Sequence, residues 1–242
     1  METKNHSLEA LYRRRFSQGW RDRLRRVLQP PAPFVMNPAE PRDFPLGRWN
    51  FYIGGAGRVV EGYINLDLFA VPGVDVAADA EQLPFPSGVF ARVECDAVLE
   101  HVRDPVKVMD EIYRVLAPGG YVHIVTPFCH PFHEYPKDYR RFTLDGLKEL
   151  GWRMEVVAKG WRTGPTATLL VFVLEYAKLL LPFRAWRVMA HGVLGWVLFP
   201  CVIWTWLCFT PQRQGASEIT VTSGCESADQ RLRGKAMGDN KN

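Results

Sequence analysis

The chain has 242 residues, of which 47% are hydrophobic and 23% charged, and its formal net charge at pH 7 is +4. These values are typical of a globular protein with a sizeable core, and they exclude wholesale disorder, a collagen-like repeat and a small disulfide scaffold. The five cysteines are scattered and form no Cys-x-x-Cys pair, which excludes a zinc knuckle or a thioredoxin-type motif. We therefore expect reduced thiols and a cytoplasmic protein.

The positive charge is concentrated near the N-terminus. Residues 1–30 hold eight Lys or Arg and three acidic residues, a net charge of +5, so the rest of the chain sums to −1. Because a nucleic-acid-binding domain carries its basic patch on the folded domain itself, we expect no nucleic-acid partner. The segment also lacks the apolar stretch and small-residue cleavage site of a secretory signal.

An amphipathic helix is predicted over residues 8–28, where apolar residues recur at three- and four-residue steps opposite an arginine-rich face. Prolines end this helix and a proline-rich linker follows, so residues 1–47 form a first segment. From 48 to 162 the pattern changes to short apolar runs separated by loops and helices. Strands are predicted at 49–53, 63–67, 74–78, 91–96, 121–126 and 154–159, with one helix from Pro105 to the stop at Pro118-Gly119-Gly120 and another over 144–150.

Strands that alternate with crossovers predict an α/β fold with a doubly wound, mostly parallel, Rossmann-like sheet, whose ligands bind at the carboxyl ends of the strands. Residues 163–210 are apolar, with helices expected at 166–182 and 186–199 and 18 uncharged residues over 192–209. We expect this segment to form a helical lid or to contact a membrane. A membrane span is disfavoured because the uncharged run of 18 residues is short and contains Pro200. Residues 211–242 form a polar tail with a candidate last strand at 217–225.

Glycines follow the first predicted strand, in the stretch FYIGGAGR over 51–58. Gly54, Gly55 and Gly57 allow backbone to approach a ligand closely, because no Cβ atom blocks that approach. A tight turn with no ligand is an equally good explanation of the glycines taken alone.

Acidic residues end the next two strands. Asp67 ends the second, where a carboxylate accepts two hydrogen bonds from a ribose diol. Asp79 follows the third, and its carboxylate together with the Ala80 N–H matches the acceptor and donor needed to bind an adenine edge. The alternatives are a helix cap or a surface acid.

Further motifs complete an ordered set between residues 49 and 160. They are Leu83-Pro84-Phe85, Val98-Leu99-Glu100-His101-Val102 and Arg114-Val115-Leu116-Ala117-Pro118-Gly119-Gly120. With the glycine turn, Asp67 and Asp79-Ala80, the chain resembles the class I S-adenosylmethionine (SAM)-dependent methyltransferases, specifically the small type 11 group. The resemblance implies SAM as cofactor, with the methionine moiety at the glycine turn, the ribose at Asp67 and the adenine at Asp79-Ala80. It also implies that Asp96-Ala97 flank the reacting sulfonium.

The chain departs from the family pattern at the glycine turn. The usual acid-x-Gly-x-Gly-x-Gly is replaced by Tyr52-Ile53-Gly54-Gly55-Ala56-Gly57, with no acid at its start. Ten positions separate Gly57 from Asp67, too few for a full helix, so a loop or a single turn must connect the strands. The alternative function is therefore a non-catalytic binding or scaffold protein of this fold at a membrane surface. A nicotinamide-dependent oxidoreductase fits less well, because its fingerprint needs a longer connection.

The stretch PFCHPFHEYPKDYRRFT, over 127–143, follows the fifth strand, where an active-site loop belongs. Methyl transfer requires alignment of nucleophile and methyl group, and a hydroxyl nucleophile is helped by a base such as neutral histidine. We expect His133, and after it His130, to be catalytic. The substrate-binding candidates are Tyr135, Asp138, Tyr139, Arg140 and Arg141, with the arginines suited to phosphate or carboxylate. The alternative is a structural loop in which Asp138 pairs with an arginine.

No metal site is expected. His130, His133 and Glu134 lack the helical i, i+4 spacing of zinc proteases, and Glu100-His101 fits a structural part of the loop after the fourth strand. The sequence thus predicts a SAM-dependent methyltransferase that O-methylates a small-molecule, sugar or lipid-linked acceptor. Peripheral membrane contact is a further expectation, since an arginine-rich amphipathic helix and the tryptophans of 192–209 suit a bilayer surface.

Overall fold

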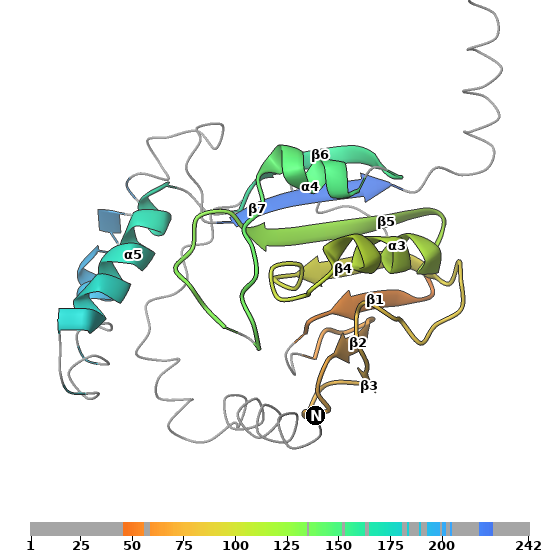
Figure 1. The fold of residues 1–242 in the computed structure, drawn as a ribbon, viewed down its shortest axis with the longest axis horizontal. Coiled ribbons are helices and arrows are strands. Elements are labelled where there is room, and N and C mark those ends of the chain that lie inside the picture. The colour runs from red at the N-terminus through yellow and green to blue at the C-terminus, as the bar shows by residue number, and fades with distance from the viewer. Residues whose placement is uncertain are drawn as a thin grey trace, which may run out of the picture.

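The computed structural model describes residues 46–55, 59–134, 136–151, 153–162, 165–180, 183, 189, 193–198, 200–201, 204 and 218–224. The predicted helix over 8–28, Gly57 and Tyr135 lie outside these residues. The strands are β1 (Asn50–Ile53), β2 (Ile64–Asp67), β3 (Val76–Ala77), β4 (Phe90–Asp96), β5 (Leu116–Pro127), β6 (Glu155–Trp161) and β7 (Glu218–Gly224), and the helices are α3 (Pro105–Val115), α4 (Leu144–Leu150) and α5 (Pro165–Leu180) (Figure 1).

The strands form one sheet in the order β3-β2-β1-β4-β5-β7-β6. Strands β1 to β5 run parallel, and β7 pairs antiparallel with both β5 and β6. The order reverses at β1, since β2 and β3 extend the sheet on one side and β4 and β5 on the other. This confirms the predicted α/β, mostly parallel Rossmann-like fold and places its topological switch point between β1 and β4.

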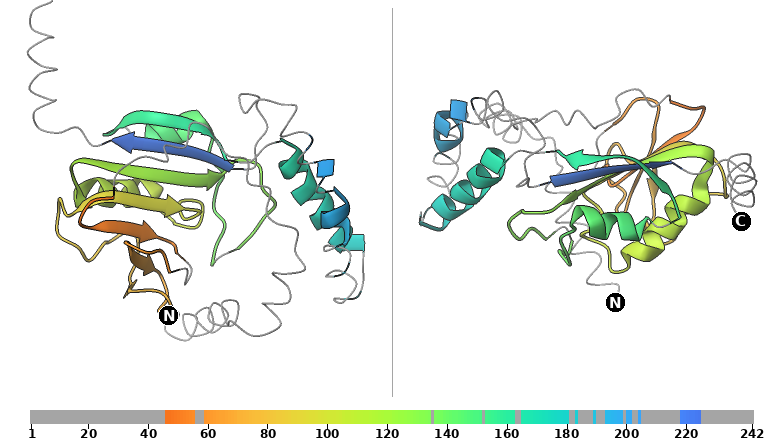
Figure 2. Two further views of the ribbon diagram at one scale, coloured as in Figure 1. Left: turned by 180° about the vertical axis from the view of Figure 1, so that it is seen from behind. Right: turned by 90° about the horizontal axis from the view of Figure 1, so that it is seen from above.

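The tail contributes a strand to the interior of the sheet. The candidate strand at 217–225 is β7, which lies between β5 and β6, with Thr126 opposite Ile219 and Trp161 opposite the same residue. Part of the segment predicted as a separate polar tail therefore belongs to the core domain. In Figure 2, β7 is seen to run against the direction of β5.

Aromatic packing at the start of the sheet positions β1. Phe51 and Phe90 are fully buried and stack at 4.7 Å between ring centroids, while Phe85 meets Phe51 edge-on at 4.9 Å. Because Phe85 follows β3 and Phe90 begins β4, these contacts hold the segment after β3 and the start of β4 against β1.

Helix α3 begins as predicted and ends earlier than predicted. Asp104 caps it by accepting a hydrogen bond from the Lys107 N–H at 3.2 Å, and Pro105 is the first helical residue. Strand β5 starts directly at Leu116, which pairs with Phe90, so the Pro118-Gly119-Gly120 stretch lies inside the strand instead of between helix and strand. A Cβ at Gly120 would lie 3.0 Å from the carbonyl oxygens of Phe90 and Ala91, so glycine permits this close pairing.

Helices α3 and α4 pack on the same face of the sheet, and α5 lies beyond the carboxyl ends of the parallel strands (Figures 1 and 2). In α5, Ala167, Leu170 and Leu174 are buried against the helical residues Leu194 and Leu198. The two predicted apolar helices thus pack on each other as a pair. Within the described residues no helix is long and apolar enough to cross a membrane.

Candidate active site

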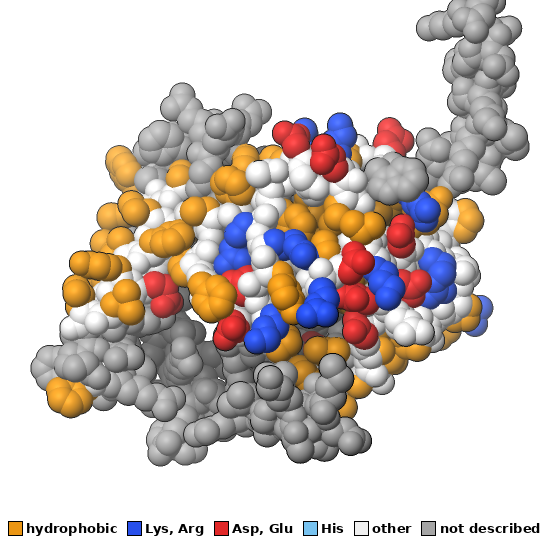
Figure 3. Space-filling view, viewed as in Figure 1, with side chains coloured by type: hydrophobic (Ala, Val, Ile, Leu, Met, Phe, Trp, Pro, Cys, Tyr) orange, Lys and Arg blue, Asp and Glu red, His pale blue; other side chains and the backbone are white. Residues whose placement is uncertain are grey.

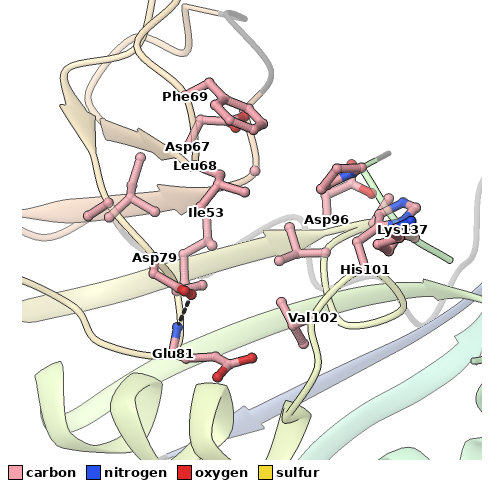
Figure 4. A pocket seen from close by; sticks show the side chains of 18 of the residues that line it. Ile53, Asp67, Leu68, Phe69, Asp79, Glu81, Asp96, His101, Val102 and Lys137 are labelled. Carbon is pink, nitrogen blue, oxygen red and sulfur yellow. Dashed lines mark hydrogen bonds between the residues drawn. The ribbon is translucent and has the colours of Figure 1, made fainter. Parts of the chain in front are cut away.

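A cavity of about 530 Å³ opens at the carboxyl ends of β1, β2 and β4. This is the switch point of the sheet, where ligands of open α/β sheets bind. All the described residues assigned to the cofactor from the sequence line it: Gly54, Gly55, Asp67, Asp79, Ala80, Asp96 and Ala97. Figure 4 shows Asp67 and Asp79 on one side of the cavity and Asp96 with His101 on the other.

Gly54 makes the turn at the end of β1. Its φ is +78°, and a Cβ on it would lie 2.2 Å from Cγ2 of Val98, in the loop after β4. The Gly54 N–H donates to the Leu66 carbonyl at 2.9 Å. Glycine is therefore required by the packing of β1 against its neighbours, and the cavity lies beside the turn that this packing allows.

Two carboxylates face the cavity from the ends of β2 and β3. Asp67 is 5% exposed and its backbone carbonyl accepts from the Ala78 N–H at 3.0 Å, which holds β2 and the start of the next loop together. Asp79 accepts a hydrogen bond from the Glu81 N–H at 2.9 Å (Figure 4). The Asp79 side chain is thus held in place, and carboxylate groups at these two positions can accept hydrogen bonds from hydroxyl or amine donors.

Asp96 and Ala97 form the opposite wall, at the end of β4. Asp96 accepts from Arg162 Nη1 at 2.8 Å and from the Tyr52 hydroxyl at 3.3 Å. Ala97 has a φ of +54°, a left-handed conformation that is uncommon for a residue with a side chain, and such strain concentrates at functional sites. Sequence reasoning missed Arg162, because it lies 66 positions from its partner and belongs to no motif.

A carboxylate and two histidines converge beside this wall. Glu100 has no exposed surface, and no other described residue donates a hydrogen bond to either of its carboxylate oxygens. Its Oε1 lies 3.5 Å from Nε2 of His101 and 3.9 Å from Nε2 of His133. Burial raises the pKa of Glu100 to about 8 and lowers the pKa of His133, since both charged forms lose hydration.

Backbone carbonyls orient both imidazole rings. Nδ1 of His101 contacts the Lys137 carbonyl oxygen, and Nδ1 of His133 lies 3.2 Å from that of Pro131. A carbonyl oxygen only accepts, so the contact with Lys137 indicates that Nδ1 of neutral His101 carries the proton and that its Nε2 is the acceptor. Nδ1 of His133 also lies 3.5 Å from Nη2 of Arg141, which is a donor. The ring of His130 packs against His133 at 4.6 Å and lies behind it, outside the cavity lining.

The arginines of the loop hold the chain itself. Arg140 donates to the carbonyls of Val102 and Arg103 at 3.0 Å, and Arg141 donates to Asp138 and to the carbonyls of His130 and Pro131. The hydrogen bonds from Arg141 lower the pKa of Asp138 to about 2. Among the substrate-binding candidates, Tyr139 lines the cavity, whereas Asp138, Arg140 and Arg141 do not, which favours the structural alternative for these three.

Comparison with known proteins identifies a methyltransferase domain in part of the chain. Residues 65–124 match the model of a family described as "Methyltransferase domain". The chain is 33% identical over 112 residues to the ubiquinone/menaquinone biosynthesis C-methyltransferase UbiE of Enterobacter sp. (strain 638), covering 41% of this chain and 44% of that protein. Residues 65–124 therefore carry a methyltransferase domain, in agreement with the resemblance to the class I SAM-dependent methyltransferases.

Two solved structures are also similar to this chain. One is the [4+2]-cyclase SpnF, with a TM-score of 0.48 and 14% identity over 86% of this chain and 82% of that one. The other is the geranyl diphosphate C-methyltransferase of Streptomyces coelicolor A3(2), with a TM-score of 0.44 and 11% identity over 74% and 71% of the two chains. The chain spans less than half the length of the curated relative above.

The residues of the methyltransferase domain fit its cofactor, SAM. The wall from Gly54 to Gly55 has no side chain to block the methionine moiety, and the buried Asp67 suits a ribose diol. The Asp79 carboxylate and the adjoining Ala80 can bind an adenine edge, and Leu68, Phe69 and Val98 supply apolar surface. The roles that the resemblance implied for these residues stay predictions.

Proposed function

We propose that the protein transfers a methyl group from SAM to a hydroxyl oxygen of a small-molecule acceptor that is a sugar or a lipid-linked molecule. One observation carries the proposal: His101 and His133 line the same cavity as the cofactor residues. The cofactor end and the histidine end are joined by the strained Asp96-Ala97 turn. An acceptor that enters between them lies within reach of both.

Bound SAM supplies a methyl group activated by its sulfonium. The chain's own task is to align acceptor and methyl group and to draw the proton from the acceptor hydroxyl. The groups suited to the second task are the ring nitrogens of His101 and His133 beside Glu100, with His130 packed behind His133. We therefore assign activation of the hydroxyl to this cluster as a unit.

The test is transfer of label from methyl-labelled SAM into separated polar and lipid extracts. We expect the protein to label one of these fractions and the variant Asp67→Ala to lose that labelling, while Asp110→Ala, on the outer surface of α3, retains it. A product whose label withstands alkaline hydrolysis but is released as methyl iodide by hot hydriodic acid, as the methyl group of an ether is, supports O-methylation, whereas a C-methyl group withstands both treatments. If SAM binds but neither fraction is labelled, the alternative of a non-catalytic binding protein is favoured.

A second observation supports contact with a membrane surface. Large apolar side chains are exposed along α5 and at described residues after it: Leu169, Phe172, Val173, Tyr176, Leu179, Leu180, Phe183, Met189, Val193, Trp196, Val197 and Trp204. Figure 3 shows hydrophobic side chains gathered over α5. Soluble monomers rarely expose an apolar patch of this extent, and aromatic residues favour the membrane interface. We propose that this apolar surface of residues 169–204 rests on a bilayer and brings the cavity to a lipid-linked acceptor.

A further inference from the structure

We propose that Glu100, His101 and His133 together bind one divalent transition-metal ion, with Zn²⁺ as the probe of choice. The three side chains offer two imidazole nitrogens and one carboxylate oxygen, all within 4.8 Å of one another. Two nitrogens and one carboxylate are the ligand set of zinc sites that keep a coordination position open. Imidazole ligands also select zinc and its neighbours over Mg²⁺ or Ca²⁺.

The buried carboxylate supplies an independent reason for an ion. Glu100 is completely buried, yet no other described residue donates to its oxygens. The Nε2 atoms of His101 and His133 lie 3.5 and 3.9 Å from Oε1 of Glu100. A carboxyl oxygen and two imidazole nitrogens thus face one another, and a cation that binds among them gives the buried Glu100 a partner, since no other described residue donates a hydrogen bond to it.

The surroundings of the histidines match those of metal ligands. In metal sites a ligating histidine usually donates its other ring N–H to a backbone carbonyl or a carboxylate, which fixes the ring. Here Nδ1 of His101 contacts the Lys137 carbonyl oxygen, and Nδ1 of His133 faces both the Pro131 carbonyl at 3.2 Å and Asp138 at 3.6 Å. Asp138 is in turn held by Arg141.

Two loops are fastened together so that their ligands meet. Glu100 and His101 follow β4, whereas His133 follows β5. The Tyr139 N–H donates to the Glu100 carbonyl at 2.8 Å, and Arg140 donates to the Val102 and Arg103 carbonyls. These hydrogen bonds hold the two loops in fixed positions, and a metal site requires that its ligands are held in place before the ion binds.

The role of the ion rests on the proposed function. Because His101 and His133 line the cavity, an ion held by them would border the space that the proposed acceptor enters. An acceptor hydroxyl bound to that ion would lose its proton to solvent more readily, since a metal ion lowers the pKa of a bound oxygen. The new O–CH₃ bond then forms as the C–S bond breaks, leaving a neutral thioether on the cofactor product. His133 is then a ligand, and the ion takes the place of a protein base.

The experiment measures metal content and zinc affinity of the whole, tag-free chain. After chelator treatment and dialysis, we expect the protein to take up about one Zn²⁺ per chain in competition with a chromophoric zinc indicator. His101→Asn and His133→Asn should each weaken zinc binding by about 100-fold or more, given that loss of an outer-shell partner alone costs 10- to 100-fold. His123→Asn is the matched control, since His123 also contacts a glutamate, at 2.7 Å from Glu94, outside the cavity.

Glu100→Gln is measured beside these variants, with thermal unfolding to establish that each is folded. Failure to bind zinc, or equal binding by the protein and His101→Asn, would overturn the proposal. Calorimetric titration with SAM on the same samples separates this failure from that of the proposed function. If SAM binds and zinc does not, the metal site is wrong and the methyltransferase proposal stands. If zinc binds and SAM does not, the metal site stands and the methyltransferase proposal is wrong.

Discussion

Position 54 combines two demands that glycine alone meets. The residue has a φ of +78°, and any Cβ would overlap Val98. The sequence pointed to a glycine turn for ligand approach, and the structure adds that the turn is needed for packing. Both roles come from the same lack of a side chain, so the sequence could not separate them.

Gly54→Ala should destabilise the protein by about 2 to 5 kcal/mol, from about 1–2 for the left-handed backbone and a further 1–3 for overpacking. Gly88→Ala is the control, since Gly88 has a similar φ of +74° but no neighbouring atom within 4 Å of the position that a Cβ would take. It should lose only the backbone contribution. Urea unfolding of both variants measures the difference, and equal losses would contradict the packing role of Gly54.

The residues of the metal proposal show where sequence reasoning stops. Glu100 and His101 lie 33 and 32 positions before His133, and no spacing rule connects them. His130, His133 and Glu134 were the metal candidates in the sequence because they are neighbours, whereas the structure brings His133 to a different loop. A local sequence motif cannot identify side chains that come together only because of the order of the strands in the sheet.

At the scale of elements, the interior of the parallel sheet was the most predictable part. The predicted strands overlap β1 to β6 because short apolar runs between turns are typical of buried strands. The start of β5 was missed because Pro-Gly-Gly usually ends a helix, yet here Gly120 admits the carbonyls of β4. The place of β7 in the sheet depends on long-range pairing that no local pattern carries.

The family motifs also have a structural explanation at this scale. Arg114 of α3 donates to the carbonyls of Phe85 and Leu83 at 2.7 and 3.0 Å, and Glu111 accepts from the Leu83 N–H at 2.8 Å. The motifs around Leu83 and Arg114 therefore fasten the segment before β4 to α3. Their presence together in the sequence reflects this contact.

The N-terminus of α3 gives a test of helix capping. Asp104→Ala should cost about 1 kcal/mol, because the Lys107 N–H loses its acceptor, and Asp104→Asn should restore most of it. Chemical denaturation measures both variants. An alanine variant as stable as the original chain would show that water replaces the cap without loss.

A partly buried pair across β4 and β5, Glu94 and His123, predicts acid sensitivity. Burial alone would raise the pKa of Glu94, but hydrogen bonding to His123 and the charges of His123 and Arg92 lower it below its usual value. A lowered folded-state pKa contributes stability that is complete above the unfolded pKa of about 4.3 and is lost as pH falls through the folded value.

Glu94→Gln should therefore lose about 1–3 kcal/mol at pH 7, the value of hydrogen bonds to a charged group. The difference from the original chain should shrink as the pH falls below about 4. Thermal unfolding at pH 7, 5 and 3 gives the comparison. A difference that stays constant with pH would show that Glu94 acts through shape and not through charge.

The whole molecule places its apolar surface at the end where the strands carry the cavity. Helix α5 lies beyond the carboxyl ends of β1, β4 and β5 (Figure 1), and Leu179 on it is 81% exposed. The composition of the sequence was enough to locate the apolar segment. The structure was needed to show which of its side chains pack together and which face solvent, because this depends on the pairing of α5 with residues 193–198.

The membrane proposal predicts co-sedimentation with vesicles of phosphatidylcholine and anionic phosphatidylglycerol. The double variant Leu179→Ser with Phe183→Ser should bind at least about tenfold more weakly, since each apolar side chain moved from water into lipid is worth up to about 1.5–3 kcal/mol. Val59→Ser, at a residue 76% exposed on the β1–β2 connection, is the control. Equal binding by all three proteins would contradict the membrane proposal.

The most direct test of the cofactor site is calorimetric titration of the whole chain with SAM, beside Asp67→Ala and the surface control Asp110→Ala. We predict that the chain and the control bind SAM alike, and that Asp67→Ala binds about 10- to 100-fold more weakly, because a buried carboxylate no longer holds the ribose. No binding by the unmodified chain, or equal binding by Asp67→Ala, would contradict the placement of the cofactor at the β1–β4 switch point.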